Sequence, residues 1–117
     1  ELPNHNREAV VLQEMIAYGT EARAAVGADG VEEILADRGR EHTVLRTLQI
    51  VGEAAAQIRK LEPDGLPGIT LGPVISVRNV LVHGYAKIRM VEVVAIIRND
   101  MPPLLDAIER LLAETPE

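Results

Sequence analysis

The sequence contains no cysteine, phenylalanine or tryptophan, and its only aromatic residues apart from histidine are Tyr18 and Tyr85. Without cysteine there are no disulfides, thiol nucleophiles or thiolate metal sites, a pattern that fits a cytoplasmic protein. The core must be aliphatic, and so few aromatic rings argue against modules that stack several RNA bases. No run of eighteen apolar residues occurs, so we expect no membrane span and no membrane partner.

The length of 117 residues, of which 47% are hydrophobic, predicts a single globular domain over residues 1–117. The net charge of −6 on its own argues against a nucleic-acid partner. Residues 70–98, however, carry four cations and one carboxylate: Arg78, Lys87, Arg89, Arg98 and Glu92. This stretch has a local charge of +3, which fits either a basic nucleic-acid surface or an ordinary solvated surface.

Apolar residues that recur every three or four positions predict amphipathic helices over residues 7–26 and 40–61. The first stripe is Val11, Met15, Tyr18, Ala22 and Ala25. The second stripe is Val44, Leu48, Val51, Ala55, Ile58 and Leu61. Asn4 or Asn6 is expected to cap the first helix and Gly27 to end it. Asp29 is expected to cap a short helix between the two.

The second half of the sequence is less decisive. Residues 71–82 are rich in β-branched side chains, which favours a strand, whereas Pro73 at the start and Gly84 after the end favour a helix. Residues 90–113 hold a helical phase through Pro102 and Pro103, which predicts a long helix that is kinked or restarted there. We therefore predict an all-α fold, an up-and-down bundle of four main helices plus one short helix.

Residues 78–85, with the sequence Arg-Asn-Val-Leu-Val-His-Gly-Tyr, concentrate the chemically useful side chains. The guanidinium of Arg78 matches phosphate oxygens, and the imidazole of His83 can move a proton near neutral pH. Asn79 and His83 are four residues apart and share a helix face, but Arg78 and His83 lie roughly 140° apart on an ideal helix. Either the helix unwinds near Gly84, or the ligand lies between two copies of the chain.

The Arg78–Tyr85 segment resembles the signature of HEPN-domain proteins, and specifically of the HepT-like toxins. Gly52-Glu53-Ala54 looks like the stretch that precedes the motif in that family, and the proline-rich loop and proline-interrupted last helix follow in family order. An aromatic residue often found before the motif is missing here. The resemblance implies a dimeric, metal-independent endoribonuclease without a cofactor. In it, His83 acts as acid or base, Arg78 binds the scissile phosphate, Asn79 orients the substrate or His83, and Glu53 pairs with Arg78.

The same resemblance implies a type VII-like toxin–antitoxin pair. An MNT-type nucleotidyltransferase antitoxin would transfer AMP onto Tyr85 and so block the RNA cleft with charge and bulk. Two alternatives remain open at this stage. In one, the chain is a non-catalytic HEPN subunit that binds nucleotide or substrate for a nucleotidyltransferase. In the other, it is a purely structural helical dimer, whose motif residues contribute to stability rather than to chemistry.

Overall fold

The computed structural model describes residues 3–82 and 85–114, with side chains from Arg7 onward. Within these residues the secondary structure is helical and contains no strand, which confirms the predicted all-α fold. The elements are α1 (Pro3–Val26), α2 (Val31–Ala36), α3 (Arg38–Leu61), α4 (Gly72–Ile75), α5 (Val77–Leu81), α6 (Ala86–Ala95), a π-helical segment η1 (Ile96–Asp100) and α7 (Met101–Glu114).

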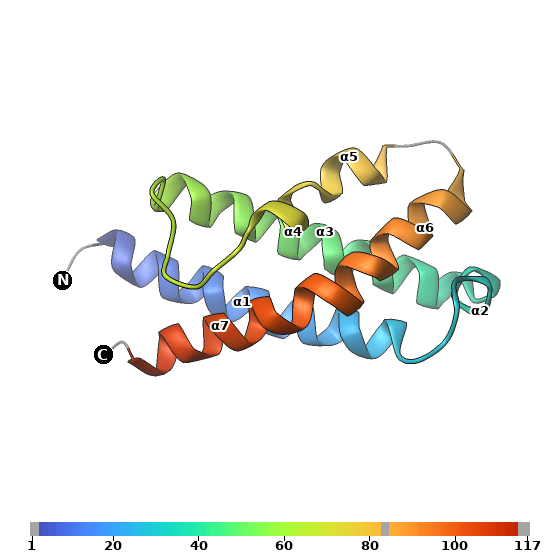
Figure 1. Cartoon of the computed structure of the whole chain (residues 1–117), viewed down its shortest axis with the longest axis horizontal. Helices are drawn as coiled ribbons and strands as arrows, with labels where there is room; N and C mark the ends of the chain where they lie inside the picture. Colours follow the sequence, from blue (N-terminus) through green and yellow to red (C-terminus); the bar gives the residue numbers. More distant parts are fainter. Residues whose placement is uncertain (1–2, 83–84, 115–117) are drawn as a thin grey trace.

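The helices run up and down along the long axis of the molecule (Figure 1). α1 and α3 lie antiparallel and share the most extensive contact in the bundle, with α2 in the connection between them. α4 and α5 return along α3, and α6, η1 and α7 form one long rod. The η1 and α7 parts of the rod pack against α1, and α6 packs against α2 and α5. The start of α1 and the end of α7 therefore lie at the same end of the bundle, opposite the start of α6.

The core is aliphatic, as the absence of Phe and Trp requires. The stripe predicted for residues 40–61 is buried from Val44 to Ile58, and Leu61 is half-buried. The rod contributes the stripe predicted for its helical phase, with Ile97, Met101 and Ile108 fully enclosed. Among the described residues, no helix is both long enough and apolar enough to span a bilayer.

The predicted cap of the short helix is wrong. α2 begins after Gly30, whose backbone is extended, and Asp29 makes no cap. Instead, the Asp29 carboxylate accepts a hydrogen bond of 2.7 Å from Nη1 of Arg40. The prediction for the end of α1 holds, since Gly27 follows its last residue with φ +55°, a conformation that glycine adopts without strain.

The second half of the bundle differs in detail from the four main helices predicted. Residues 71–82 form two short helices rather than one, and they break at Ser76, whose hydroxyl donates to the Pro73 carbonyl at 2.6 Å. The long helix predicted over residues 90–113 begins earlier, at Ala86, and its irregular part is the π-helical segment η1 just before Pro102. A proline leaves the carbonyl four residues earlier without a donor, and a wider helical turn accommodates this within a continuous rod.

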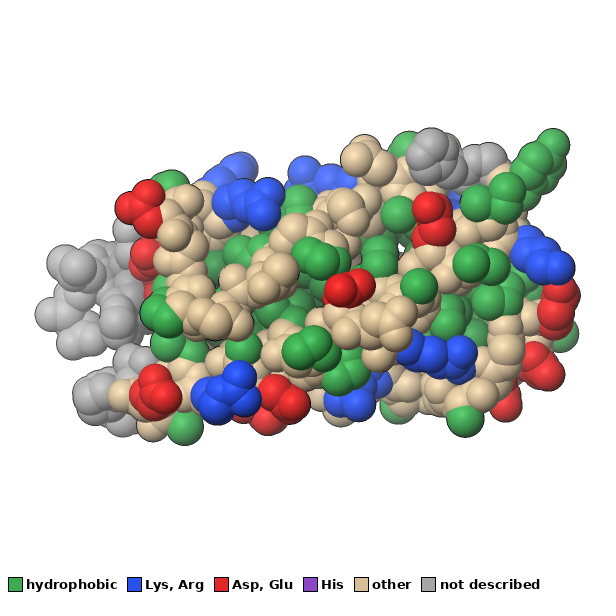
Figure 2. Space-filling model, viewed as in Figure 1, with side chains coloured by type: hydrophobic (Ala, Val, Ile, Leu, Met, Phe, Trp, Pro, Cys, Tyr) green, Lys and Arg blue, Asp and Glu red, His purple; other side chains and the backbone are tan. Residues whose placement is uncertain are grey.

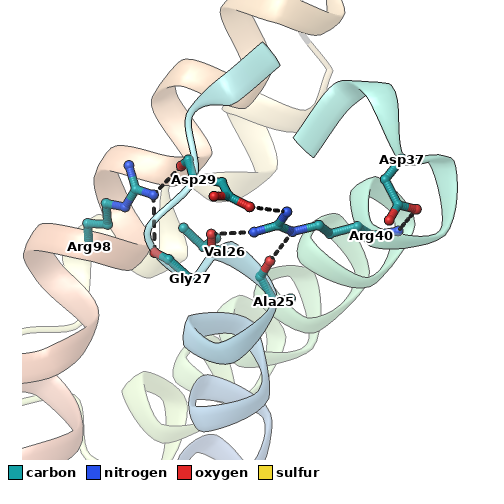
Figure 3. A network of polar contacts seen from close by, with 7 residues as sticks. All are labelled: Ala25, Val26, Gly27, Asp29, Asp37, Arg40 and Arg98. Atoms are coloured by element: carbon teal, nitrogen blue, oxygen red, sulfur yellow. Dashed lines mark hydrogen bonds and ion pairs between the residues drawn. The ribbon is translucent and has the colours of Figure 1, made fainter. Parts of the chain in front are cut away.

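Two arginines fix the turn between α1 and α2 (Figure 3). Arg40, on α3, donates through Nε to the Ala25 carbonyl at 2.6 Å and through Nη2 to the Val26 carbonyl at 2.8 Å. Arg98, in η1, donates to the carbonyls of Gly27 and Asp29. The last carbonyls of a helix lack partners within it, and Arg40 satisfies two of them at the end of α1. Arg98 binds two carbonyls of the turn that follows, so the two guanidinium groups join α1, α3 and η1.

Candidate functional site

The structure brings together two residues of the predicted site that are 25 positions apart. Arg78, on α5, donates through Nη2 to Oε1 of Glu53, on α3, at 2.8 Å. The side chains are 56% and 51% exposed, so the pair lies at the surface and the guanidinium has free donors facing solvent. A pair this exposed contributes little to stability, but it restricts the direction in which Arg78 points.

Gly52 explains why α5 can lie so close to α3. A Cβ atom at this position would lie 2.7 Å from Cγ1 of Val77 and 2.8 Å from the carbonyl oxygen of Val74. Only a residue without a side chain permits this approach of the two backbones. Gly52 thus sets the distance between the helices, and Glu53, the next residue, reaches Arg78 across the contact.

Asn79 follows Arg78 on α5 and is exposed. In the described structure its side chain makes no hydrogen bond, so the amide is available to a ligand. Tyr85 directly precedes α6 and is 78% exposed. His83, the predicted acid or base, lies outside the described residues, as does Gly84. The position of the imidazole relative to Arg78 therefore stays a prediction.

Arg89 is a residue whose position the sequence did not reveal. Its Nη1 donates to the Leu81 carbonyl at 3.2 Å, so a side chain of α6 holds the last residue of α5. The contact spans the connection that carries the second half of the motif. Sequence reasoning counted Arg89 as a surface cation, because only the packing of α6 beside α5 shows that it can reach this carbonyl.

The cations of residues 70–98, which fitted either a basic nucleic-acid surface or an ordinary solvated surface, mostly make contacts within the chain. Besides Arg89 and Arg98, Lys87 is engaged through a 2.6 Å ion pair with Glu32 on α2. Hydrogen bonding to Glu32 raises the pKa of Lys87 above its ordinary value. Of the four cations in that stretch, Arg78 pairs with Glu53, a residue of the predicted site, and keeps a half-exposed guanidinium.

Apolar side chains surround the motif at the surface. Val82, directly after α5, is 82% exposed, and on α6 Ile88 and Val91 are 55% and 49% exposed. Ile88, Val91 and the exposed Ala95 recur every three or four residues and so form one stripe along α6. Figure 2 shows hydrophobic side chains on this end of the molecule. We refer to Val82, Ile88, Val91 and Ala95 as the apolar surface.

The donor set of the described residues offers no metal centre, since no three His, Asp or Glu side chains lie close enough to share an ion. What the site does offer is an oriented guanidinium, a free amide and a phenol at the edge of an apolar surface.

Comparison with known proteins places this geometry in context. The family model described as Ribonuclease HepT-like matches residues 15–111, a range that includes Glu53, Arg78, Asn79 and Tyr85. A protein of Methanocaldococcus jannaschii, named "Putative RNase MJ1380", is 26% identical over 77 residues, which cover 66% of this chain and 71% of that protein. No solved structure matches.

Proposed function

The chain belongs to the HepT-like ribonuclease family, and we propose that it is an endoribonuclease that cleaves RNA with Arg78 and His83. The observation that carries the proposal is the Glu53–Arg78 pair. It places a guanidinium at the surface, with free donors, beside the free amide of Asn79. A phosphodiester is the group that such a fork of donors binds best.

The proposed reaction needs no metal ion. His83 removes the proton from a ribose 2′-OH, and the resulting oxygen attacks the adjacent phosphorus. Arg78 stabilises the negative charge that develops on the phosphoryl oxygens. The bond from phosphorus to the 5′ oxygen breaks, and that oxygen takes a proton from an acid in the cleft. The products are a 2′,3′-cyclic phosphate and a 5′-hydroxyl. Asn79 orients the substrate or His83, and Glu53 keeps Arg78 in place.

A homodimer completes the proposed site. Arg78 and His83 do not converge on an ideal helix, and a two-fold axis beside them would bring a second Arg78 and His83 to the same cleft. The apolar surface supports this arrangement, because exposed apolar stripes on soluble proteins commonly mark contacts with another chain. Tyr85 lies at the edge of that surface, where α6 begins.

We further propose that Tyr85 is the residue through which the activity is turned off. Its phenol is exposed, and among the described residues it has no hydrogen-bond partner. A partner nucleotidyltransferase of the MNT type would catalyse attack of this oxygen on the α-phosphorus of ATP, with release of pyrophosphate. The AMP group adds a negative charge and bulk at the mouth of the cleft, which repels and blocks RNA. In this role the chain is the toxin of a toxin–antitoxin pair.

Cleavage of RNA by purified variants, in the presence of a chelator, tests the nuclease. We expect wild type to produce 2′,3′-cyclic phosphate ends. Arg78→Ala and His83→Ala should each lose about 10²- to 10³-fold in rate. Arg110→Ala, which removes an exposed cation of α7, is the matched control. If both motif variants cleave RNA as fast as wild type, the proposal fails.

A separate experiment tests the control of the toxin. Co-expression with the partner enzyme should add one or more increments of about 329 Da, the mass of an AMP residue, to the wild-type chain. Tyr85→Phe lacks the acceptor oxygen, so it should stay unmodified and keep its toxicity when the partner is present. An unchanged mass of the wild-type chain after co-expression would contradict the proposed modification.

A further inference from the structure

The charge of this acidic protein is distributed unevenly over its helices. α3, α4 and α5 together hold six of the twelve cations and only two of the eighteen carboxylates. Their local charge is +4 within a chain of net −6, so the remaining residues carry −10. Figure 2 shows Lys and Arg side chains along the upper edge of the molecule, where α5 and the C-terminal part of α3 lie, and others along the lower edge among carboxylates. A polyanion would therefore meet attraction at α3 and repulsion over most of the other surface.

Three of the five cations of α3 lie on its outward face. The buried side of the helix carries Val44, Leu48, Val51 and Ile58, and residues on the opposite side are exposed. The outward positions with charged or titratable side chains are Arg38, His42, Arg46, Glu53 and Lys60. These five are separated by four, four, seven and seven residues, which keeps them on one face of an α-helix.

The only carboxylate on this face is Glu53, and Arg78 neutralises it. Arg46 and Lys60 stand on either side of it. Each lies seven residues from Glu53, which corresponds to about 10.5 Å along the helix axis. In the part of the chain that the structure describes, neither Arg46 nor Lys60 has an ion-pair partner. Arg40, by contrast, is on the same helix but is used to clamp the end of α1.

We infer that the outward face of α3 is a track for the RNA backbone, with Arg46 and Lys60 binding phosphates on either side of the one held by Arg78. This inference rests on the proposed function and adds the direction in which the substrate lies. The track from Arg46 to Lys60 is about 21 Å long, which corresponds to roughly six stacked nucleotides. No base-reading side chain is required, so the track binds RNA without strong sequence preference.

The salt dependence of RNA binding tests the track. Each neutralised phosphate of a single strand contributes about −0.7 to the slope of log K against log salt concentration. We would measure the anisotropy of a labelled twelve-nucleotide RNA between 50 and 300 mM salt, in the His83→Ala background so that it is not cleaved. Arg46→Gln/Lys60→Gln should reduce the steepness of the slope by about 1.4 and weaken binding ~25-fold at 0.1 M salt.

The matched control is Arg23→Gln/Arg110→Gln, which removes the same charge from exposed positions on α1 and α7. The track is supported if the α3 pair changes the slope and the control pair leaves it near the parent value. It is overturned if both pairs change the slope equally or if neither does. A parent protein that binds no RNA at all overturns the proposed function as well, so the two failures are distinguishable. Thermal melts confirm that each variant is folded.

Discussion

At the level of single residues, Gly52 and Glu53 have two connected structural roles. Gly52 allows the backbone of α4 and α5 to approach α3, and Glu53 uses that proximity to orient Arg78. The sequence shows the two residues side by side and shows Arg78 much later. It does not show that the missing Cβ is what makes the Glu53–Arg78 contact possible. The geometry gives a physical reason for a Gly-Glu pair in the helix that precedes the motif.

Gly52→Ala should separate α5 from α3. The new methyl group would meet the Val74 carbonyl oxygen and Val77 at less than 3 Å, and backbone atoms cannot rotate away as a flexible side chain can. We expect a loss of about 1–3 kcal/mol in the free energy of unfolding, together with slower RNA cleavage because Arg78 is displaced. Denaturant unfolding and the cleavage assay measure the two effects.

Gly39→Ala is the control for that substitution. It makes the same change on the same helix, but the nearest atom to its Cβ, Oδ1 of Asp37, lies at an ordinary 3.6 Å. Alanine is the better helix former, so Gly39→Ala should be neutral or slightly stabilising. If Gly52→Ala were equally harmless, close packing at Gly52 would not be what positions α5.

At the level of elements, the helices were largely predictable because their apolar positions recur at helical spacing. The stripes over residues 7–26 and 40–61 are confirmed. The helical spacing of apolar residues over residues 90–113 matches the buried positions of the rod. The misses have local causes. Aspartate is a residue type that often caps helices, but the Asp29 carboxylate accepts a hydrogen bond from Arg40 instead. The two helices within residues 71–82 are each too short for a periodic pattern to show the break at Ser76.

The site was predictable in composition and only partly in geometry. Residues 78–85 contain a guanidinium, an amide, an imidazole and a phenol. This combination indicates a functional site from the sequence alone. The contacts that shape the site join distant parts of the chain: Arg78 to Glu53 on α3, and Arg89 back to Leu81. Whether a given arginine binds a ligand or a carbonyl of its own chain depends on packing, which spacing alone does not determine.

Arg40 should matter to stability far more than its neighbours on α3. Its guanidinium satisfies two carbonyls at the end of α1 and pairs with Asp29. Arg40→Ala leaves these groups without charged donors, so we expect a loss of about 2–3 kcal/mol. Arg46→Ala, on the exposed face of the same helix, should change stability by less than about 0.5 kcal/mol. Thermal and denaturant melts of the two variants compare them directly, and equal losses would contradict the clamp.

At the level of the whole molecule, the end of the bundle where α1 begins and α7 ends contains a buried carboxyl group. Glu8 of α1 is 9% exposed and lines a recess with Leu12, Leu66 and Glu62. Burial, followed by hydrogen bonding and charge repulsion with Glu62, raises the pKa of Glu8 from 4.5 to about 7. The folded chain therefore binds a proton that the unfolded chain releases between these values.

The sign of the resulting pH dependence follows from this. Because the pKa is higher in the folded state, the contribution of Glu8 to stability is fully present below about pH 4.5 and is lost as the pH rises through about 7. The loss is about 1–3 kcal/mol, because solvent screens part of the effect. Glu8→Gln should flatten the dependence of the unfolding free energy between pH 5 and 8, whereas Glu14→Gln, at an exposed position of α1, should leave it intact. A wild type whose stability rises over this range would contradict the proposed burial of a protonated Glu8.

The opposite end of the bundle decides whether the proposed site can be complete, because the apolar surface lies there beside the motif. If that surface joins two copies, Ile88→Glu places a carboxylate in the contact and should cost about 2–4 kcal/mol of association, or roughly 30- to 1000-fold in Kd. Sedimentation should then show monomers, and RNA cleavage should fall in parallel because each Arg78 loses its counterpart. Val10→Glu alters an equally exposed apolar residue on α1 and should leave both unchanged. If the Ile88→Glu variant is monomeric and still cleaves RNA at the wild-type rate, a single chain carries out the whole reaction.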